Sequence, residues 1–178
     1  MSTSNPVQMA PSPEEISQVA DVLARLHSGF LPKPIFLEVA RLCTTPTIEL
    51  VPLRSVGGDV EVLLIQRPDD DPYWPSQWHV PGTVVRATDA GDSFSKPFQR
   101  LYDDELQVHP VATPQRVGQM LHKVRRGTEL ANIFYIDLSD IETPVGNWYP
   151  AHALPDTTVG TQRELIAQAV KLFKGEHI

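Results

Sequence analysis

The chain has 178 residues, of which 41% are hydrophobic and 21% are charged, as is ordinary for a soluble globular protein. Its formal net charge of −7 argues against a nucleic-acid polymer as the main partner, because binding a phosphate backbone needs a basic surface. No stretch approaches the roughly 18 consecutive apolar residues that span a bilayer, and the N-terminus lacks the apolar core of a secretory signal. Cys43 is the single cysteine, so no internal disulfide is expected. We therefore expect a cytoplasmic protein with no membrane or nucleic-acid partner.

The N-terminal part of the chain is predicted to be a disordered tail over residues 1–11 and a two-helix extension over 12–45. Ser12 is the expected cap of the first helix, Pro13 fits its first position, and Glu15 completes a Ser-x-x-Glu capping box. Apolar residues follow at helical spacing until Gly29, which suits the helix end: Ile16, Val19, Ala20, Leu23 and Leu26.

A second helix is predicted over residues 35–43, again with one apolar face. Because a single apolar face must pack on something, we expect this extension to cover the main domain or to form a homodimer contact. A separate binding module is the alternative. A helix-turn-helix fits the spacing, but the second helix carries no basic decoration.

From about residue 46 the pattern changes to strands, and it predicts one α/β domain over 46–178. Two hairpins are expected, with turns at 55–59 and 125–128. The other expected elements are a strand end at Trp78 before a Pro-Gly turn, a short strand at 84–85, a helix over 95–106 capped by Ser95, an irregular connection over 148–155 and a final helix over 161–173. Mixed strands around two helices indicate an α/β sandwich.

The helix predicted over residues 95–106 carries the residues that indicate chemistry. Residues three or four apart share a helix face, so positions 101, 104 and 105 are expected to cluster. Asp104 and Glu105 then project to one side, where their carboxylates can hold a hard cation. Arg100 is placed to brace Asp104 or to reach back to Asp92, whereas Asp103 is expected to face water. An acidic run alone is more often a solvated helix face than a metal site.

The segment 78–108 resembles the signature of the Nudix family, and the order of elements over 46–174 is similar to that of a Nudix domain. The signature is Gly, five residues, Glu, seven residues, then Arg-Glu-hydrophobic-any-Glu-Glu-any-Gly-hydrophobic. Gly82, Arg100, Glu105 and Val108 match it, and Asp92, Tyr102 and Asp104 are conservative replacements. Three features depart from it: Leu101 in place of a Glu, Gln107 in place of the closing Gly, and nine residues between Gly82 and Asp92 instead of five.

The resemblance implies an α/β/α sandwich with a mixed sheet, and a hydrolase that cleaves the P–O–P linkage of a nucleoside diphosphate joined to another moiety. In that family the helix carboxylates bind Mg²⁺ or Mn²⁺, which clamp the diphosphate and activate water. Applied to this chain, Asp104 and Glu105 would bind the metal and act in catalysis with Arg100, which Asp92 would anchor.

Leu101 removes one of the expected metal ligands. The alternative is therefore a Nudix-like protein that binds a nucleotide or metabolite without turnover, and a third possibility is an interaction scaffold that dimerises through the N-terminal helices. Candidate replacement ligands are Asp89, Glu129, Asp140 and Glu142. Isoprenoid-diphosphate isomerase chemistry is disfavoured, because it needs a positioned cysteine and Cys43 lies outside the matched domain.

Three arginines are candidates for binding a small anionic, nucleotide-like substrate: Arg67 at a strand end, and Arg125 and Arg126 in a hairpin turn. The alternatives are pairing of Arg67 with Asp69 or Asp70, and a solvated basic loop. Aromatic candidates for stacking on a base are Tyr73, Trp74 and Trp78, with Trp78 favoured as a core residue. His79 and His122 are expected to be structural.

Overall fold

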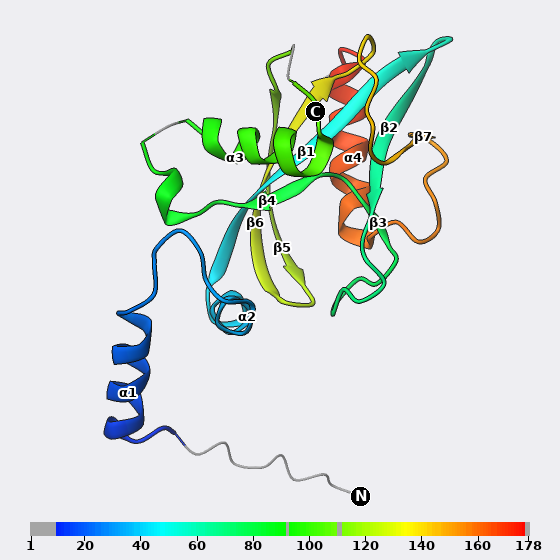
Figure 1. Cartoon of the computed structure of the whole chain (residues 1–178). Helices are drawn as coiled ribbons and strands as arrows, with labels where there is room; N and C mark the ends of the chain where they lie inside the picture. Colours follow the sequence, from blue (N-terminus) through cyan, green and yellow to red (C-terminus); the bar gives the residue numbers. More distant parts are fainter. Residues whose placement is uncertain (1–9, 92, 110–111, 177–178) are drawn as a thin grey trace, which may run out of the picture.

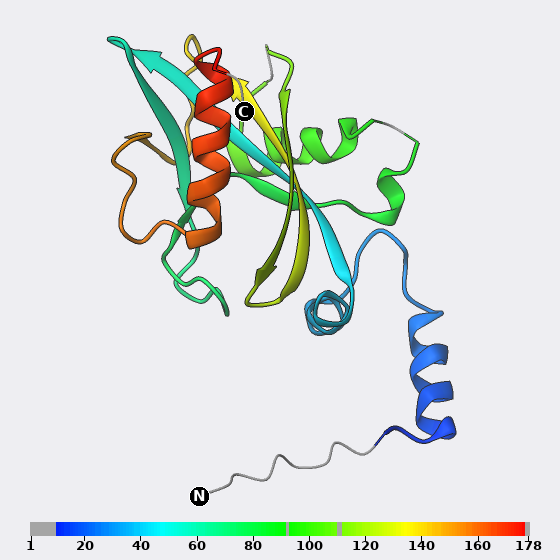
Figure 2. The ribbon, with the colours of Figure 1, turned by 180° about the vertical axis from the view of Figure 1, so that it is seen from behind.

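The computed structural model describes residues 10–91, 93–109 and 112–176. In this part of the chain the strands form one mixed sheet in the order β3-β2-β1-β6-β5, and β4 pairs with β1 while β7 pairs with β2. The strands are β1 (Thr44–Val56), β2 (Asp59–Gln66), β3 (Trp78–His79), β4 (Gly82–Val84), β5 (Gln115–Val124), β6 (Gly127–Asp137) and β7 (Asn147–Pro150). Helices α3 (Ser95–Arg100) and α4 (Gly160–Phe173) lie on opposite faces of the sheet (Figures 1 and 2). The predicted α/β sandwich is confirmed.

Strand β1 changes its neighbour on one side part-way along its length. Its first half pairs with β4, where Glu49 lies opposite Gly82, and its second half pairs with β2, where Leu53 lies opposite Val62. On its other side β1 runs parallel to β6 from Thr44 to Leu53. The sheet therefore divides where Glu49 lies, and this division positions the candidate site.

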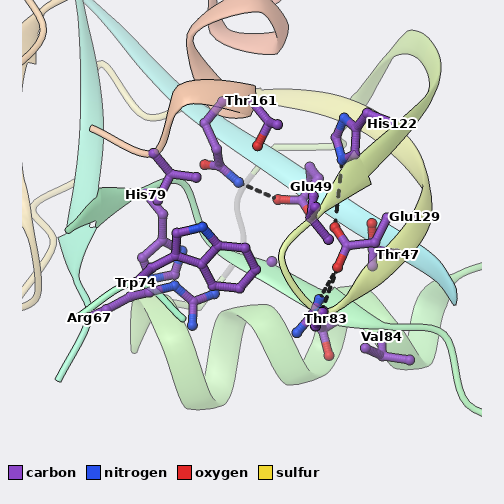
Figure 3. A pocket seen from close by; sticks show the side chains of 15 residues that line it. Thr47, Glu49, Arg67, Trp74, His79, Thr83, Val84, His122, Glu129 and Thr161 are labelled. Atoms are coloured by element: carbon purple, nitrogen blue, oxygen red, sulfur yellow. Dashed lines mark hydrogen bonds and ion pairs between the residues drawn. The ribbon is translucent and has the colours of Figure 1, made fainter. Parts of the chain in front are cut away.

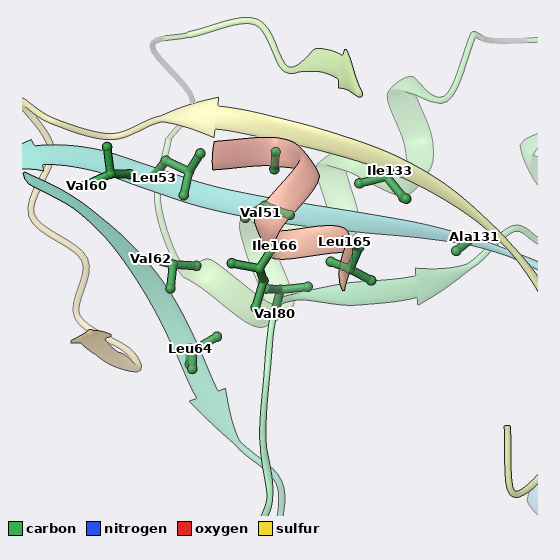
Figure 4. Packing of buried hydrophobic residues seen from close by; sticks show 11 residues of the cluster. Val51, Leu53, Val60, Val62, Leu64, Val80, Ala131, Ile133, Leu165 and Ile166 are labelled. Atoms are coloured by element: carbon green, nitrogen blue, oxygen red, sulfur yellow. The ribbon is translucent and has the colours of Figure 1, made fainter. Parts of the chain in front are cut away.

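Successive side chains of a strand point to opposite faces of the sheet, so the apolar side chains form two hydrophobic cores, one on each face. Val51 and Leu53 of β1 pack toward α4 with Val60, Val62 and Leu64 of β2, as Figure 4 shows. The opposite face packs against α3 and the turn after it. Its buried residues include Ile48, Leu50, Leu63, Phe134, Ile136, Leu101, Tyr102 and Leu106.

Both predicted hairpins are present, and Gly57 and Gly58 have positive φ angles of 58° and 93°, as the tight β1–β2 turn requires. One strand was not predicted: β7 overlaps the start of the segment expected to be irregular and pairs with β2. Pro150 ends β7, so the proline that suggested a loop marks the end of a short strand.

The predicted helix over 95–106 is present, but it is not a uniform α-helix. It begins at Ser95, with Phe94 at the N-cap position in a left-handed conformation (φ 64°) and no side-chain cap, so the expected capping by Ser95 is wrong. After Arg100 the chain continues as a wider π-helical turn, η2 (Leu101–Leu106). Gln107 then adopts a left-handed conformation (φ 53°). The Nudix signature has a Gly at this position, and glycine adopts this conformation readily.

The N-terminal extension contains α1 (Pro13–Leu23) and α2 (Lys33–Leu42). The capping box is confirmed, with Ser12 and Glu15 exchanging hydrogen bonds of 2.8 and 3.2 Å. Helix α2 packs on the sheet and buries Ala40, whereas α1 has no buried residue and lies away from the domain (Figures 1 and 2). The tail predicted over 1–11 lies almost entirely outside the described residues. Among the helices that are described, none is long and apolar enough to cross a membrane.

Candidate functional site

Leu101 lies in the core and not on an exposed acidic face. Its side chain is 0% exposed and packs with the sheet residues of the second core. Asp104 is exposed and Glu105 half-buried, so the expectation that position 101 shares one face with Asp104 is wrong. Asp103 is exposed and accepts hydrogen bonds of 2.9 Å from Gln99, as expected for a solvated position.

Arg100 forms a two-pronged hydrogen-bonded pair with Asp89 in the short helix η1 (Ala87–Asp89). Nη1 and Nη2 lie 2.7 and 2.8 Å from the two carboxylate oxygens, and Nη2 also donates to the Val84 carbonyl at 3.0 Å. The hydrogen bonds from Arg100 hold the pKa of Asp89 below its usual range despite burial of the carboxyl group.

This pairing corrects two sequence-based expectations. The arginine is directed at Asp89 and not at Asp104, and its expected anchor, Asp92, lies outside the described residues. Asp89 therefore occupies the anchoring role, and the pairing engages both of its carboxylate oxygens, which argues against Asp89 as a replacement metal ligand. Only residues 83–88 then separate Gly82 from the anchoring acid, so most of the extra loop length lies after Asp89.

Asp104 and Glu105 are the adjacent carboxylates on the exposed side of η2. Burial raises the pKa of Glu105, Arg67 opposes this effect, and the neighbouring charge of Asp104 reinforces it. Within the described ranges, no cluster of three or more His, Cys, Asp or Glu side chains is placed to hold a metal ion. Two carboxylates still fit a Mg²⁺ ion that keeps several waters and takes phosphate oxygens from a ligand.

Arg67 connects this helix to a pocket on the far side of β1. Its Nη1 donates to Asp71 at 2.8 Å, and its guanidinium lies 5.0 Å from the centre of the Trp74 ring. Asp69 and Asp70 were the predicted alternative partners of Arg67, but the structure pairs it with Asp71. Arg67 lines the pocket, and its charge opposes the raised pKa of Glu105, so it is the candidate link between the pocket and the acidic turn.

The pocket has a volume of about 90 Å³ and lies where the sheet divides (Figure 3). Glu49 extends into it from β1 and accepts a 2.9 Å hydrogen bond from Gln162 Nε2, while Gln162 Oε1 accepts one of 2.6 Å from the Val80 backbone. Burial and the charge of Glu129 raise the pKa of Glu49 to about 7. A Cβ atom on Gly82 would lie 2.7 Å from the Glu49 carboxylate, so any larger residue there would force this carboxylate to move.

Glu129 is the second acid of the pocket. It was predicted to lie in a loop facing the helix, but it is buried in β6, with Arg126 Nε at 2.5 Å and His122 Nε2 at 3.6 Å from its carboxylate oxygens. Asp140 and Glu142, the other late candidates, are exposed after the end of β6.

The predicted basic hairpin turn lies at the mouth of the pocket. Arg126 lines the pocket and its guanidinium is 5.7 Å from the Trp74 ring centre. Arg125 donates to the Tyr73 carbonyl. The turn is thus joined to the loop that carries Trp74, and it is not simply solvated.

The pocket walls also contain polar atoms with remaining hydrogen-bonding capacity. Arg67 Nε and His122 Nδ1 are buried without a hydrogen-bond partner in the described part of the chain. His79 Nδ1 lies 2.7 Å from the Val80 carbonyl, and burial lowers the pKa of this histidine to about 4, so it is neutral near pH 7. Trp78 packs edge-on against Tyr149 in the first core, as predicted.

Sequence reasoning missed Glu49 and Gln162. The available signal for Glu49 was an acid within an otherwise apolar strand, since a buried carboxyl group is rarely kept without a partner. Gln162 gave no comparable signal, because a glutamine in the first turn of an amphipathic helix is ordinary.

Comparison with known proteins gives the fold. No protein-family model matches the chain, and no curated protein matches it by sequence. The Nudix domain of NrtR from Shewanella oneidensis, solved with ADP-ribose, has a TM-score of 0.61 at 19% identity, over 86% of this chain and 97% of that one. The C. elegans Ap4A hydrolase has a TM-score of 0.57 at 16% identity, over 74% and 99% of the two chains.

A third similar structure is the C-terminal domain of mouse MUTYH, solved in complex with human PCNA. It has a TM-score of 0.57 at 16% identity, over 76% of this chain and 92% of that one. These likenesses show that the chain has the Nudix fold. Since one fold hosts several functions, they do not by themselves assign an activity.

Proposed function

We propose that this protein is a divalent-metal-dependent hydrolase that cleaves the P–O–P linkage of a nucleoside diphosphate joined to a second moiety. The observation that carries the proposal is the position of Arg67, whose charge acts on Glu105 and whose side chain lines the polar pocket. A ligand with a diphosphate beside Arg67 would have its phosphates near the acidic turn and its remaining part near the pocket. The ADP-ribose bound to NrtR and the name of the Ap4A hydrolase fit this ligand class.

Asp104 and Glu105 are the residues that would hold Mg²⁺ or Mn²⁺. When bound, such an ion neutralises phosphate charge and makes water a better nucleophile. Arg67, which lines the pocket, would bind a phosphate oxygen through its guanidinium group. Arg100 positions the helix, because its pairing with Asp89 joins the start of η2 to η1.

In this proposal, part of the nucleoside of the ligand lies at the pocket. Trp74 presents an aromatic ring at its mouth, and stacking on such a ring is a common way to bind a base. Glu49 and Gln162 present fixed hydrogen-bonding groups deeper inside. His122 Nδ1 adds one more polar atom to the wall.

A second candidate function is binding of the same ligand class without turnover. Leu101 favours it, because the carboxylate that would complete the Nudix metal set is replaced by a core residue that is 0% exposed. With two ligands on the turn, a site that needs several metal ions is harder to assemble. The two functions predict the same binding site and differ only in chemistry.

Phosphate release would be measured on nucleoside triphosphates, nucleotide sugars, ADP-ribose and dinucleoside polyphosphates, with Mg²⁺ or Mn²⁺. Hydrolysis should require the metal and fall by at least about 100-fold in Glu105→Gln, while the matched control Asp103→Asn, on the solvated side of the same turn, should retain activity. Calorimetric titration with the same compounds runs in parallel. Binding without release by the folded protein would favour the second candidate, and neither binding nor release would contradict both.

A further inference from the structure

Helix α1 has an apolar side that covers nothing in the described part of its own chain. Its residues Ile16, Val19, Val22 and Leu23 are 55%, 58%, 44% and 42% exposed, and at about 100° per residue they form one stripe. An isolated helix of 11 residues is marginal in water. This helix therefore needs a partner surface to remain folded.

The same chain contains a groove of matching character. It has a volume of about 560 Å³ and is lined by the linker after α1, by α2 and by the segment around β4. Its apolar residues include Phe30, which is 72% exposed, together with Phe36, Val39 and Val85. Single exposed apolar side chains are ordinary on a protein surface, but contiguous apolar surfaces such as the stripe and the groove mark interaction sites.

The net charges of helix α1 and of the groove have opposite signs. Helix α1 carries three acids and no base, namely Glu14, Glu15 and Asp21, and two of them, Glu14 and Asp21, lie on the side of the helix opposite the stripe, so they act on the encounter through net charge and not through contacts in the groove. The charged residues that line the groove are Lys33 and Arg86, and no acid lines it. Complementary charges steer and orient such an encounter.

We propose that α1 of one copy of this chain docks in the groove of a second copy, and that the exchange is reciprocal. In each chain the linker that carries α1 outward forms one wall of the groove, so the helix of that chain leads away from its own groove (Figures 1 and 2). Reciprocal exchange buries both stripes and closes a two-fold dimer.

The groove shares a wall with the candidate site. Gly82, Thr83 and Val84 line both the groove and the polar pocket. A helix from the partner would thus pack behind the strand that carries the glycine facing Glu49. The dimer would stabilise this wall whether or not the protein is a hydrolase.

The first test is the mass of the full-length chain in solution, measured by light scattering over a range of concentrations. The wild type should be a dimer, and Val19→Asp on the stripe should weaken the dimer by roughly 100-fold or more, because it places a charge in an apolar contact. The matched control Ser17→Asp lies about 200° round the helix from Val19 and should remain dimeric. A monomeric wild type would overturn the proposal.

Groove variants separate helix-in-groove docking from helix–helix pairing. Phe30→Asp should also give monomers. Because the Phe30 side chain is exposed in a single chain, this substitution should leave the fold of the chain intact. Mixing Val19→Asp with Phe30→Asp should restore partial association, since one intact helix then meets one intact groove. A Phe30→Asp protein that dimerises like the wild type would overturn docking in this groove.

Crosslinking identifies which copy provides the helix. Cys43 is free, exposed and lines the groove, so Val22→Cys adds a second thiol on α1. A short bismaleimide should join the two thiols between chains and give a covalent dimer that is absent from the wild type. Crosslinking only within one chain would show that α1 folds back on its own groove. Because none of these measurements uses turnover, they can fail or succeed independently of the proposed hydrolase activity.

Discussion

Arg100 and Asp89 join the helix of the candidate site to the loop before it through two hydrogen bonds of 2.7 and 2.8 Å. The Asp89 side chain is 3% exposed and that of Arg100 is 19% exposed. The pair is therefore well shielded from solvent, and removing one partner leaves the other charge without compensation.

Asp89→Asn should lower the free energy of unfolding by about 3 kcal/mol near pH 7, because it leaves the Arg100 charge buried and unpaired. Since the pKa of Asp89 is lowered in the folded protein, its contribution is present above the unfolded pKa of about 3.9 and is lost as the pH falls through the lower folded value. Urea unfolding at a series of pH values measures both effects.

The matched control is Glu38→Gln, which removes the partner of Arg41 in a pair whose side chains are 65% and 60% exposed. This change should cost less than about 1 kcal/mol. Equal losses in the two variants would contradict a special role for Asp89.

Leu101→Glu, which restores the acid of the Nudix signature, should destabilise the protein by about 3 kcal/mol or more and should not raise turnover. The new carboxylate would lie in the core among Ile48, Leu63 and Tyr102, where an unpaired charge is costly. Leu101→Met, which conserves volume, should cost less than about 1.5 kcal/mol. Thermal unfolding and phosphate release test the pair. A folded Leu101→Glu protein with raised turnover would show that the turn can expose position 101.

The sequence predicted most of the fold because its signals were local. Capping at Ser12, the glycines at 57 and 58, and the final amphipathic helix each depend on neighbouring residues, and each is found. The site was harder, because its geometry depends on distant contacts. Leu101 lies in the core, and Arg100 pairs with Asp89 instead of Asp104. Glu49 and Gln162 lie 113 residues apart, so no spacing rule could bring them together.

Tyr102→Phe should leave the protein as stable as the wild type or stabilise it by up to about 1 kcal/mol. The Tyr102 hydroxyl is buried without a hydrogen-bond partner in the described structure, and burial raises its pKa to about 12. Removing an unsatisfied buried polar group relieves its desolvation cost, while the ring contact with Phe98 is kept. Tyr102→Ala, which removes the ring as well, should cost about 3 kcal/mol or more. Denaturant midpoints give both values, and a marked loss in Tyr102→Phe would reveal a partner for the hydroxyl.

Glu49→Gln should remove a pH dependence of stability that the wild type possesses. The pKa of Glu49 is raised from 4.5 to about 7 in the folded protein, so the protonated form is favoured there. Below about pH 4.5 the group is protonated in both states and has no effect, but between pH 4.5 and 7 the unfolded state ionises first and wild-type stability falls. The fall should reach up to about 3 kcal/mol.

Glutamine is nearly isosteric with the protonated acid, so Glu49→Gln should match the wild type at pH 4.5 and exceed its stability at pH 8. Glu164→Gln, on the exposed side of α4, should change neither the slope nor the midpoint. Parallel urea curves for the wild type and Glu49→Gln across this range would mean that Glu49 is ionised in the folded pocket, where Arg126 and Gln162 would then have to stabilise its charge.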